Sequence, residues 1–347
     1  MIKEHLNNKW TRGLGVVIIV LFVAVYFYRT NQCDCVARIS YKDINLNQGM
    51  NIDSLLRPID NAEVAKTMKD WSQFNLESDS FKVIKSFAYN KQRKLVLVQH
   101  FFAGDGHYGA IILPEDYDKS KKYPLLIWAN GLNQSNPSVD LFKRSEIQAL
   151  VGGLQQYFIV VPSFRGQALV INQHRYCSDG FFGDAFDGAT DDALRLMHLT
   201  KINYPAVDSN RLAVYGVSRG GTVAMLAGIR YPSLHCVAAQ TGPSDFLLKS
   251  VYRKFGMQYK YQFLSQALPL SSLRTKIIKS SPAHFISYYP NNLLLVYGEQ
   301  DGTVGLENAT FLLNQLQEKK NIEHVFLKAG HNFDYVQPVM EWLKKYN

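Results

Sequence analysis

Signatures of several common protein classes are missing from this chain of 347 residues. It contains no low-complexity tract and no internal repeat, which argues against a solenoid or a propeller. The nine histidines form no H-E-x-x-H or similar metal-binding spacing, and no glycine-rich loop of the phosphate-binding kind is present. We therefore expect neither a metal ion nor another cofactor.

A nucleic-acid partner is not indicated either, despite the net charge of +9. The lysines and arginines are scattered through loops and both termini, and no basic helix or interleaving of basic and aromatic residues occurs. We interpret the charge as a contribution to solubility, with apposition to a membrane as the alternative. With 47% hydrophobic and 13% aromatic residues, the chain can bury a large core.

Cysteine is scarce, and four cysteines fit either an oxidising or a reducing compartment. Cys33 and Cys35 are too close to pair comfortably with each other, but one of them could reach Cys177, which lies in a polar loop. Cys236 lies in an apolar run and is expected to be an inert core residue. We expect no thiol to act as a nucleophile.

One apolar run, residues 14–28, stands out near the N-terminus, with basic residues before it and Arg29 after it. A helix over this run reaches about 22 Å, short of a bilayer core of about 30 Å unless Trp10 and Tyr28 extend it as interfacial anchors. No small-x-small cleavage site follows it. We predict a single-pass signal anchor over residues 1–29, with an extracytoplasmic domain behind it, and a cleaved secretory signal as the alternative.

The pattern changes twice after this run. Residues 30–80 are predicted to form a polar stalk and an amphipathic helix, in which Met68 and Trp71 belong to a packing face. From residue 81, apolar runs such as 124–129 alternate with helical stretches, as strands buried on both faces of a parallel sheet do. Residues 81–347 therefore predict one α/β domain with a mostly parallel, eight-stranded sheet covered by helices on both faces.

Residues 216–220 have the sequence Gly-Val-Ser-Arg-Gly and directly follow an apolar run at 212–215. Glycines on both sides of Ser218 suit a sharp strand-to-helix turn, because side chains there would collide with the neighbouring strand or helix. The small residues at 222–228 suit a helix packed closely on a sheet. The motif is short enough to arise by chance, so Ser218 is either a nucleophile or an ordinary turn residue until its partners are found.

Two partners for a nucleophilic serine follow it along the chain. Asp301 and His331 each come directly after an apolar strand, which places them at the same sheet edge as Ser218. Serine, acid and histidine thus occur in the order and at the positions that this kind of triad requires. Glu299 is the nearest rival acid and His324 the nearest rival base, but Glu299 lies closer to its strand and His324 lies inside one.

The tetrahedral intermediate of such a reaction needs hydrogen-bond donors for its oxyanion. One is expected to be the backbone N–H of Arg219, directly after the nucleophile. The second is expected from the Asn-Gly-Leu-Asn turn at residues 130–133, from a backbone N–H near Gly131 or Leu132. Glycine in this turn would let the backbone approach the oxyanion.

With these residues in place, the chain resembles an α/β-hydrolase, most similar to the catalytic domain of the prolyl oligopeptidase (S9) family of serine peptidases. The resemblance implies Ser218 as nucleophile, Asp301 as the acid that orients the base, and His331 as the base. It extends from about residue 108 to the C-terminus and includes the segments 109–114, 121–126, 162–166, 182–184, 191–194, 281–282 and 298–304.

The chain also departs from this family. Family peptidases carry a long β-propeller before the hydrolase domain, and the stretch before the first strand here is far too short for one. Arg219 stands where an aromatic residue is usual, and it either favours a carboxylate-bearing substrate or is a surface arginine at a helix start. Residues 246–279 are expected to form a helical cap over the pocket that sets specificity.

The sequence therefore predicts a membrane-anchored serine hydrolase that forms an acyl-enzyme on Ser218. Its substrate is a peptide or an acyl ester, since both bonds are cleaved by the same mechanism. The alternatives are a carboxylesterase or acyl hydrolase of small substrates, and a catalytically inactive α/β-hydrolase fold that acts as a binding protein.

Overall fold

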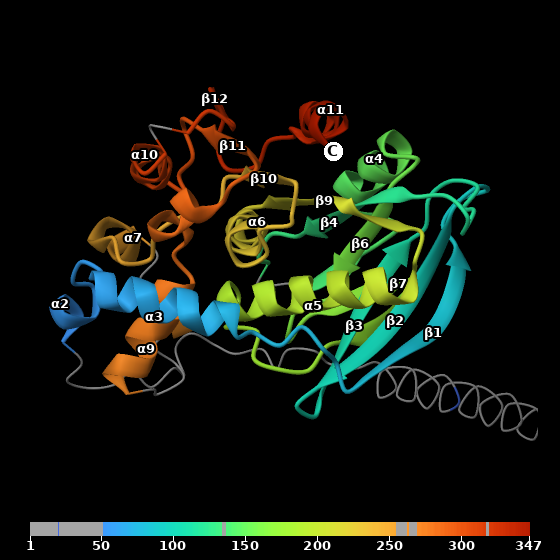
Figure 1. The fold of residues 1–347 in the computed structure, drawn as a ribbon, viewed down its shortest axis with the longest axis horizontal. Coiled ribbons are helices and arrows are strands. Elements are labelled where there is room, and N and C mark those ends of the chain that lie inside the picture. Colours follow the sequence, from blue (N-terminus) through green and yellow to red (C-terminus); the bar gives the residue numbers. More distant parts are fainter. Residues whose placement is uncertain (1–19, 21–50, 134–136, 255–261, 264–268, 317–318) are drawn as a thin grey trace, which may run out of the picture.

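A nine-stranded sheet forms the centre of the molecule (Figure 1). The computed structural model describes residue 20 and residues 51–133, 137–254, 262–263, 269–316 and 319–347. The strand order is β1-β2-β3-β6-β4-β9-β10-β11-β12. The strands are β1 (Ser80–Ala88), β2 (Lys94–Phe102), β3 (Asp105–Ile112), β6 (Phe158–Pro162), β4 (Tyr123–Ala129), β9 (Val207–Val217), β10 (Cys236–Gln240), β11 (Asn292–Gly298) and β12 (Ile322–Leu327).

The sheet is antiparallel from β1 through β6 and parallel from β6 through β12. The predicted α/β fold with a mostly parallel sheet is confirmed, but the predicted number of eight strands is wrong. The edge strand β1 pairs with β2 over most of its length although most of its side chains are exposed. The strand pattern predicted from residue 81 onward includes this edge strand, which pairs through its backbone groups without the burial pattern of an inner strand.

Helices cover both faces of the sheet, as the alternating pattern predicts (Figure 1). In β4, Leu125 and Ile127 belong to one core cluster, whereas Leu126 and Trp128 belong to the other. This alternation follows from the period of two along a strand. The first cluster includes residues of α5 (Asp187–Asn203) and α6 (Arg219–Arg230), and the second includes residues of α4 (Ser145–Gly153) and α11 (Val336–Tyr346).

A small second sheet, not expected from the sequence, has the order β5-β7-β8. Its strands are β5 (Ser138–Asp140), β7 (Ala168–Ile171) and β8 (His174–Cys177). Strands of three or four residues are too short to display an alternating pattern, so sequence periodicity misses them.

The described residues from 51 to β1 pack on the domain that contains the central sheet. Helix α3 (Asn61–Ser72) begins with a capping box between Asp60 and Glu63. Glu63 also accepts hydrogen bonds from Arg274 of α9 (Leu270–Lys279), at 2.6 and 2.8 Å. Trp71 is buried in the first core cluster, on the predicted packing face. The part of 30–80 that the structure describes thus shares the core of the domain instead of standing apart as a stalk.

Among the described residues, no helix combines the length and the apolar character that crossing a bilayer requires. The predicted signal anchor and the run at 14–28 lie outside these residues, apart from Val20, and so do Cys33 and Cys35. Cys236 is fully buried with a free thiol, and burial raises its pKa to about 12, as expected of an inert core residue. Cys177 is disulfide-bonded.

Candidate active site

Ser218 occupies a sharp turn between β9 and α6, with φ +56° and ψ −120°. This conformation is strained for a residue other than glycine. A Cβ atom on Gly216 would lie 1.9 Å from the carbonyl oxygen of Gly220, and one on Gly220 would lie 1.9 Å from that of Ala129. Both flanking glycines are therefore required by close backbone contacts, as the motif predicts.

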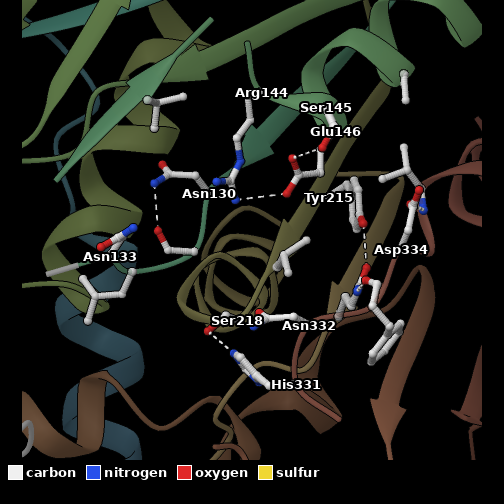
Figure 2. Close-up of a pocket in the computed structure, with 18 of the residues that line it drawn as sticks. Asn130, Asn133, Arg144, Ser145, Glu146, Tyr215, Ser218, His331, Asn332 and Asp334 are labelled. Atoms are coloured by element: carbon white, nitrogen blue, oxygen red, sulfur yellow. Dashed lines mark hydrogen bonds and ion pairs between the residues drawn. The ribbon is translucent and has the colours of Figure 1, made fainter. Parts of the chain in front are cut away.

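The structure brings Ser218, His331 and Asp301 into one hydrogen-bonded chain. His331 Nε2 lies 2.9 Å from Ser218 Oγ (Figure 2), and His331 Nδ1 lies 2.7 Å from Asp301 Oδ2. The three residues follow β9, β12 and β11, at the carboxyl ends of parallel strands. The rivals Glu299 and His324 are exposed and take no part in this chain.

The Asp301 carboxylate is held from both of its oxygens. Its Oδ1 accepts hydrogen bonds from the backbone N–H groups of Thr303 and Val304, at 2.7 and 2.8 Å. Burial raises the pKa of Asp301, but the hydrogen bonds from His331 and from these N–H groups outweigh it, so the pKa lies below its usual value. An ionised Asp301 can accept the Nδ1 proton of His331, which leaves Nε2 free to accept a proton from Ser218.

The predicted oxyanion turn lies beside Ser218. The position of a Cβ atom on Gly131 is 3.5 Å from Ser218 Cβ, and Gly131 and Leu132 line the same pocket as Ser218. That spacing is ordinary van der Waals contact, so a close approach does not by itself demand glycine here. Arg219 is the first residue of α6, and the first N–H groups of a helix have no acceptor within it.

The Arg219 side chain contradicts both expectations drawn from the sequence. It is 2% exposed, so it is not a surface arginine, and it is not among the residues that line the pocket. Its guanidinium instead donates hydrogen bonds to the carbonyl oxygens of Asn130 and Gly131 and to the side chain of Gln167. The sequence around Arg219 does not signal this burial, because the groups it contacts are far away along the chain.

A pocket of about 880 Å³ opens at the triad (Figure 2). Its walls include the 130–133 turn, β5, the first turn of α4 and the loop at 331–334. Its lining is rich in polar side chains, among them Arg144 and Glu146, whose ion pair has an N–O distance of 3.0 Å. None of the described residues of 246–279, the predicted cap, lines this pocket. In the part of the chain that the structure describes, no group of three or more His, Cys, Asp or Glu residues is arranged to hold a metal ion.

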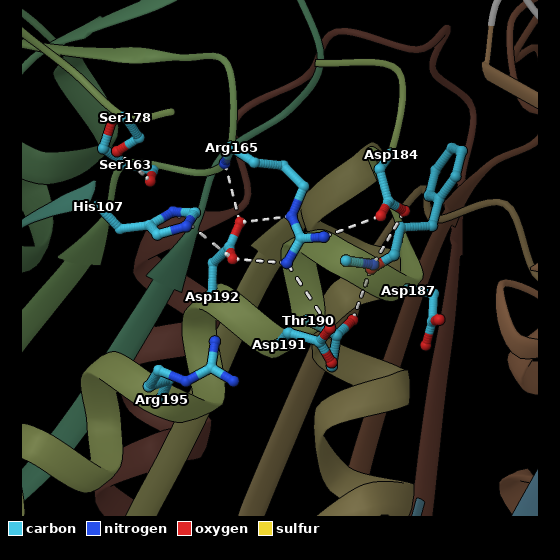
Figure 3. A network of polar contacts seen from close by, with 12 residues as sticks. His107, Ser163, Arg165, Ser178, Asp184, Asp187, Thr190, Asp191, Asp192 and Arg195 are labelled. Atoms are coloured by element: carbon cyan, nitrogen blue, oxygen red, sulfur yellow. Dashed lines mark hydrogen bonds and ion pairs between the residues drawn. The ribbon is translucent and has the colours of Figure 1, made fainter. Parts of the chain in front are cut away.

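A partly buried ionic network holds the loop that contains Arg165 (Figure 3). The Arg165 side chain binds Asp192 at 2.8 Å and Asp184 at 2.9 Å, and its backbone N–H donates to Asp192 at 2.8 Å. Burial raises the pKa of Asp192, but Arg165 and His107 outweigh it and hold this pKa at about 2. Residues 162–166, 182–184 and 191–194 are among the segments that carry the family resemblance, but the sequence alone assigns them no role.

The comparisons with known proteins agree with this geometry. Residues 182–346 match the family model described as the prolyl oligopeptidase family. A probable dipeptidyl-aminopeptidase B of Ajellomyces capsulatus (strain H88) is 24% identical over 231 residues, which are 64% of this chain and 23% of that protein. The prolyl endopeptidase FAP of Bos taurus is 26% identical over 208 residues, 59% of this chain and 26% of that protein. The chain thus spans about a quarter of the length of these relatives.

Solved structures show the same fold at low identity. Acetyl xylan esterase 1 from Thermoanaerobacterium sp. JW/SL YS485 has a TM-score of 0.61 and 18% identity, covering 85% of this chain and 98% of that chain. The acylaminoacyl peptidase of Pyrococcus horikoshii has a TM-score of 0.52 and 15% identity, covering 78% and 49%.

The fold and the arrangement of Ser218, His331 and Asp301 are of the kind that serine hydrolases use, a class that includes peptidases and esterases. The resemblance to the prolyl oligopeptidase family is confirmed by the match over residues 182–346. No β-propeller occurs among the residues that the structure describes.

Proposed function

We propose that this protein is a serine hydrolase that cleaves peptide or ester bonds through an acyl-enzyme on Ser218. The observation that carries the proposal is the chain of hydrogen bonds from Ser218 through His331 to Asp301, at the edge of a pocket. An inactive binding protein would not need a strained serine paired with an oriented histidine.

In the acylation step, Ser218 Oγ attacks the carbonyl carbon while His331 Nε2 takes the hydroxyl proton. The tetrahedral intermediate places its negative oxygen near the backbone N–H of Arg219 and the N–H of Gly131 or Leu132. His331 then gives its proton to the departing amine or alcohol, and the acyl group stays on Ser218. In deacylation a water molecule gives a proton to His331 Nε2 and attacks the acyl carbon. His331 then returns the proton to Ser218 Oγ as the acid leaves.

Peptide and ester substrates have different support. The curated relatives named as peptidases favour a peptide bond. The second candidate, an acyl hydrolase of small esters, is supported by the likeness to an acetyl xylan esterase over nearly all of that shorter chain. The polar pocket lining favours a substrate with hydrogen-bonding groups under either hypothesis.

Labelling with a fluorophosphonate probe tests the nucleophile. Wild type is expected to react covalently, Ser218→Ala is not, and the exposed Ser120→Ala is expected to label like wild type. Equal labelling of wild type and Ser218→Ala, or no labelling of a correctly folded wild type, would contradict the proposal and favour a binding protein. A panel of aminoacyl amides and short-chain acyl esters then identifies the bond, and turnover of esters alone would exclude the peptidase.

We further propose that the N-terminal segment anchors the enzyme in a membrane, with the hydrolase domain in an extracytoplasmic compartment. The apolar run at 14–28 supports the anchor, and the disulfide at Cys177 supports an oxidising compartment. Protein that stays with membranes after an alkaline carbonate wash is the expected result, and release by the wash would refute the anchor. Peptide mapping without reduction would show whether Cys33 or Cys35 pairs with Cys177.

A further inference from the structure

Arg219 is a buried cation held by carbonyl oxygens. Its Nε and Nη2 atoms each lie 3.3 Å from the carbonyl oxygen of Asn130, and Nη2 lies 3.2 Å from that of Gly131 and 3.0 Å from Gln167 Oε1. The guanidinium lies 4.6 Å from the ring centroid of Phe164. Within the described part of the chain, no carboxylate lies within ion-pair distance of it.

This arrangement is costly for folding alone. Burial lowers the pKa of Arg219 to about 9, with only a longer-range attraction from Asp192 to oppose it. A buried charge without a carboxylate partner contributes less to the stability of the folded protein than a well-packed apolar side chain of similar size would. A guanidinium at this position therefore suggests a role beyond packing.

That role follows from the geometry of the peptide groups that Arg219 binds. In a trans peptide the carbonyl oxygen of one residue and the N–H of the next point in opposite directions, and none of the described peptides is cis. Hydrogen bonds to the oxygen of Asn130 therefore direct the N–H of Gly131 away from the guanidinium. The bond to the oxygen of Gly131 does the same for the N–H of Leu132.

We propose that the Arg219 side chain is a positioning residue that holds the peptides of Asn130–Gly131 and Gly131–Leu132 with their N–H groups toward the oxyanion. The inference rests on the proposed function and deepens it. Arg219 then contributes twice, because its backbone N–H is an expected oxyanion donor and its side chain orients the other. A cationic donor on the carbonyl of Asn130 also polarises that peptide and makes the N–H of Gly131 a stronger donor.

The contacts around the turn support this assignment. The side-chain amide of Asn130 donates to the carbonyl oxygen of Gly131 at 2.8 Å, so this oxygen accepts from two donors. On the other side, the backbone oxygen of Gln167 accepts a hydrogen bond from Ser163 at 3.1 Å. The same loop is fastened by Arg165 to Asp192 (Figure 3). Arg219 thus connects the turn to a firmly held segment.

The test compares Arg219→Lys and Arg219→Met with wild type, using nitrophenyl acetate or the better substrate from the panel. Turnover is expressed per site titrated with the fluorophosphonate, so that unfolded protein does not count. We expect kcat to fall about 10- to 100-fold, below the 10²- to 10³-fold loss of a whole oxyanion donor. KM is expected to change less than about threefold, and a boronic acid that forms a tetrahedral adduct is expected to bind more weakly by the same factor as kcat.

Arg230→Lys is the matched control, since Arg230 is also a buried arginine of α6 and binds Asp187 and Asp191 instead of the turn. It is expected to lower the melting temperature without changing kcat per titrated site. Asn130→Ala removes one of the two donors to the Gly131 oxygen and is expected to lower kcat by a smaller factor than Arg219→Met.

Two results would overturn the inference alone. One is a wild-type kcat per titrated site in Arg219→Met. The other is a loss confined to KM and to carboxylate-bearing substrates, which would make Arg219 a substrate-binding residue. A folded wild type that does not react with the fluorophosphonate would instead overturn the proposed function, and this inference with it.

Discussion

Replacing Asp301 by asparagine is a sharp test of the triad, because the structure fixes which way the new amide would point. Asp301 Oδ1 accepts from the N–H groups of Thr303 and Val304, at 2.7 and 2.8 Å. The amide oxygen of Asp301→Asn is expected to keep both bonds, which turns the NH₂ group toward His331 Nδ1. Nδ1 must then accept a hydrogen bond from this NH₂ group. The ring proton therefore lies on Nε2, which cannot take a proton from Ser218.

The size of the effect follows from the cost of escaping this arrangement. A flipped amide would restore the correct tautomer but would leave two backbone N–H groups without an acceptor. At about 1–3 kcal/mol for each group, the flip costs about 4 kcal/mol. With about 1.4 kcal/mol for a factor of ten, about one molecule in 10³ has the flipped amide. We therefore expect kcat/KM to fall about 10³-fold or more.

The assay measures ester hydrolysis by wild type and Asp301→Asn after checking both for the same melting behaviour. Glu299→Gln is the matched control, because this exposed acid also follows β11 and takes no part in the hydrogen-bonded chain. It is expected to retain wild-type kcat/KM. A folded Asp301→Asn enzyme that loses less than tenfold would refute the reasoning about the tautomer.

Two further predictions concern the frame around the site. Gly220→Ala is expected to abolish fluorophosphonate labelling and lower the melting temperature, because its Cβ would lie 1.9 Å from the carbonyl oxygen of Ala129. Gly152→Ala, with nothing within 4 Å of its Cβ, should label normally. The second concerns Asp192, whose pKa is about 2 against an ordinary 3.8. Because this pKa is lower in the folded state, the ionised carboxylate stabilises the folded state at pH values above the ordinary pKa. This stabilisation of about 2 kcal/mol is lost as the pH falls from about 4 to about 2. Urea unfolding of Asp192→Asn should therefore show a smaller loss of stability between pH 5 and pH 3 than wild type, and an identical loss would contradict the role of Arg165.

The triad geometry was predictable because each of its residues lies directly behind a strand that the sequence displays clearly. Strands β9 and β11 are almost wholly buried over their last residues, so they appear as continuous apolar runs. Parallel strands end at one edge of the sheet, and short loops leave Ser218, Asp301 and His331 little room to lie elsewhere. The glycines on both sides of Ser218 were predictable too, because the close contacts that require them arise from the local strand-to-helix turn.

The environment of Arg219 could not be predicted in this way. Its partners Asn130 and Gln167 lie 89 and 52 residues away in sequence, on loops whose conformations depend on the finished fold. A helix start followed by small residues gives no sign of whether its first side chain turns inward. The three-residue β5 was missed for a related reason, since it is too short to display a burial pattern that periodicity detects.

The contrast between residues placed by strands and residues placed by loops explains why the predicted chemistry is better defined than the substrate. The triad is placed by the parallel strands of the central sheet, but much of the pocket wall is formed by β5 and α4, which lie between β4 and β6 along the chain. The lining side chains there, such as Arg144 and Glu146, lie outside the core cluster to which Ile147 and Leu150 of α4 belong, so they can vary without disturbing the sheet. We therefore expect the choice of substrate to depend on these lining side chains, whereas the preceding turn at residues 130–133 is bound to α6 by Arg219. Exchanging these lining side chains should change which substrates bind while leaving the reactivity of Ser218 toward small phosphonates in place.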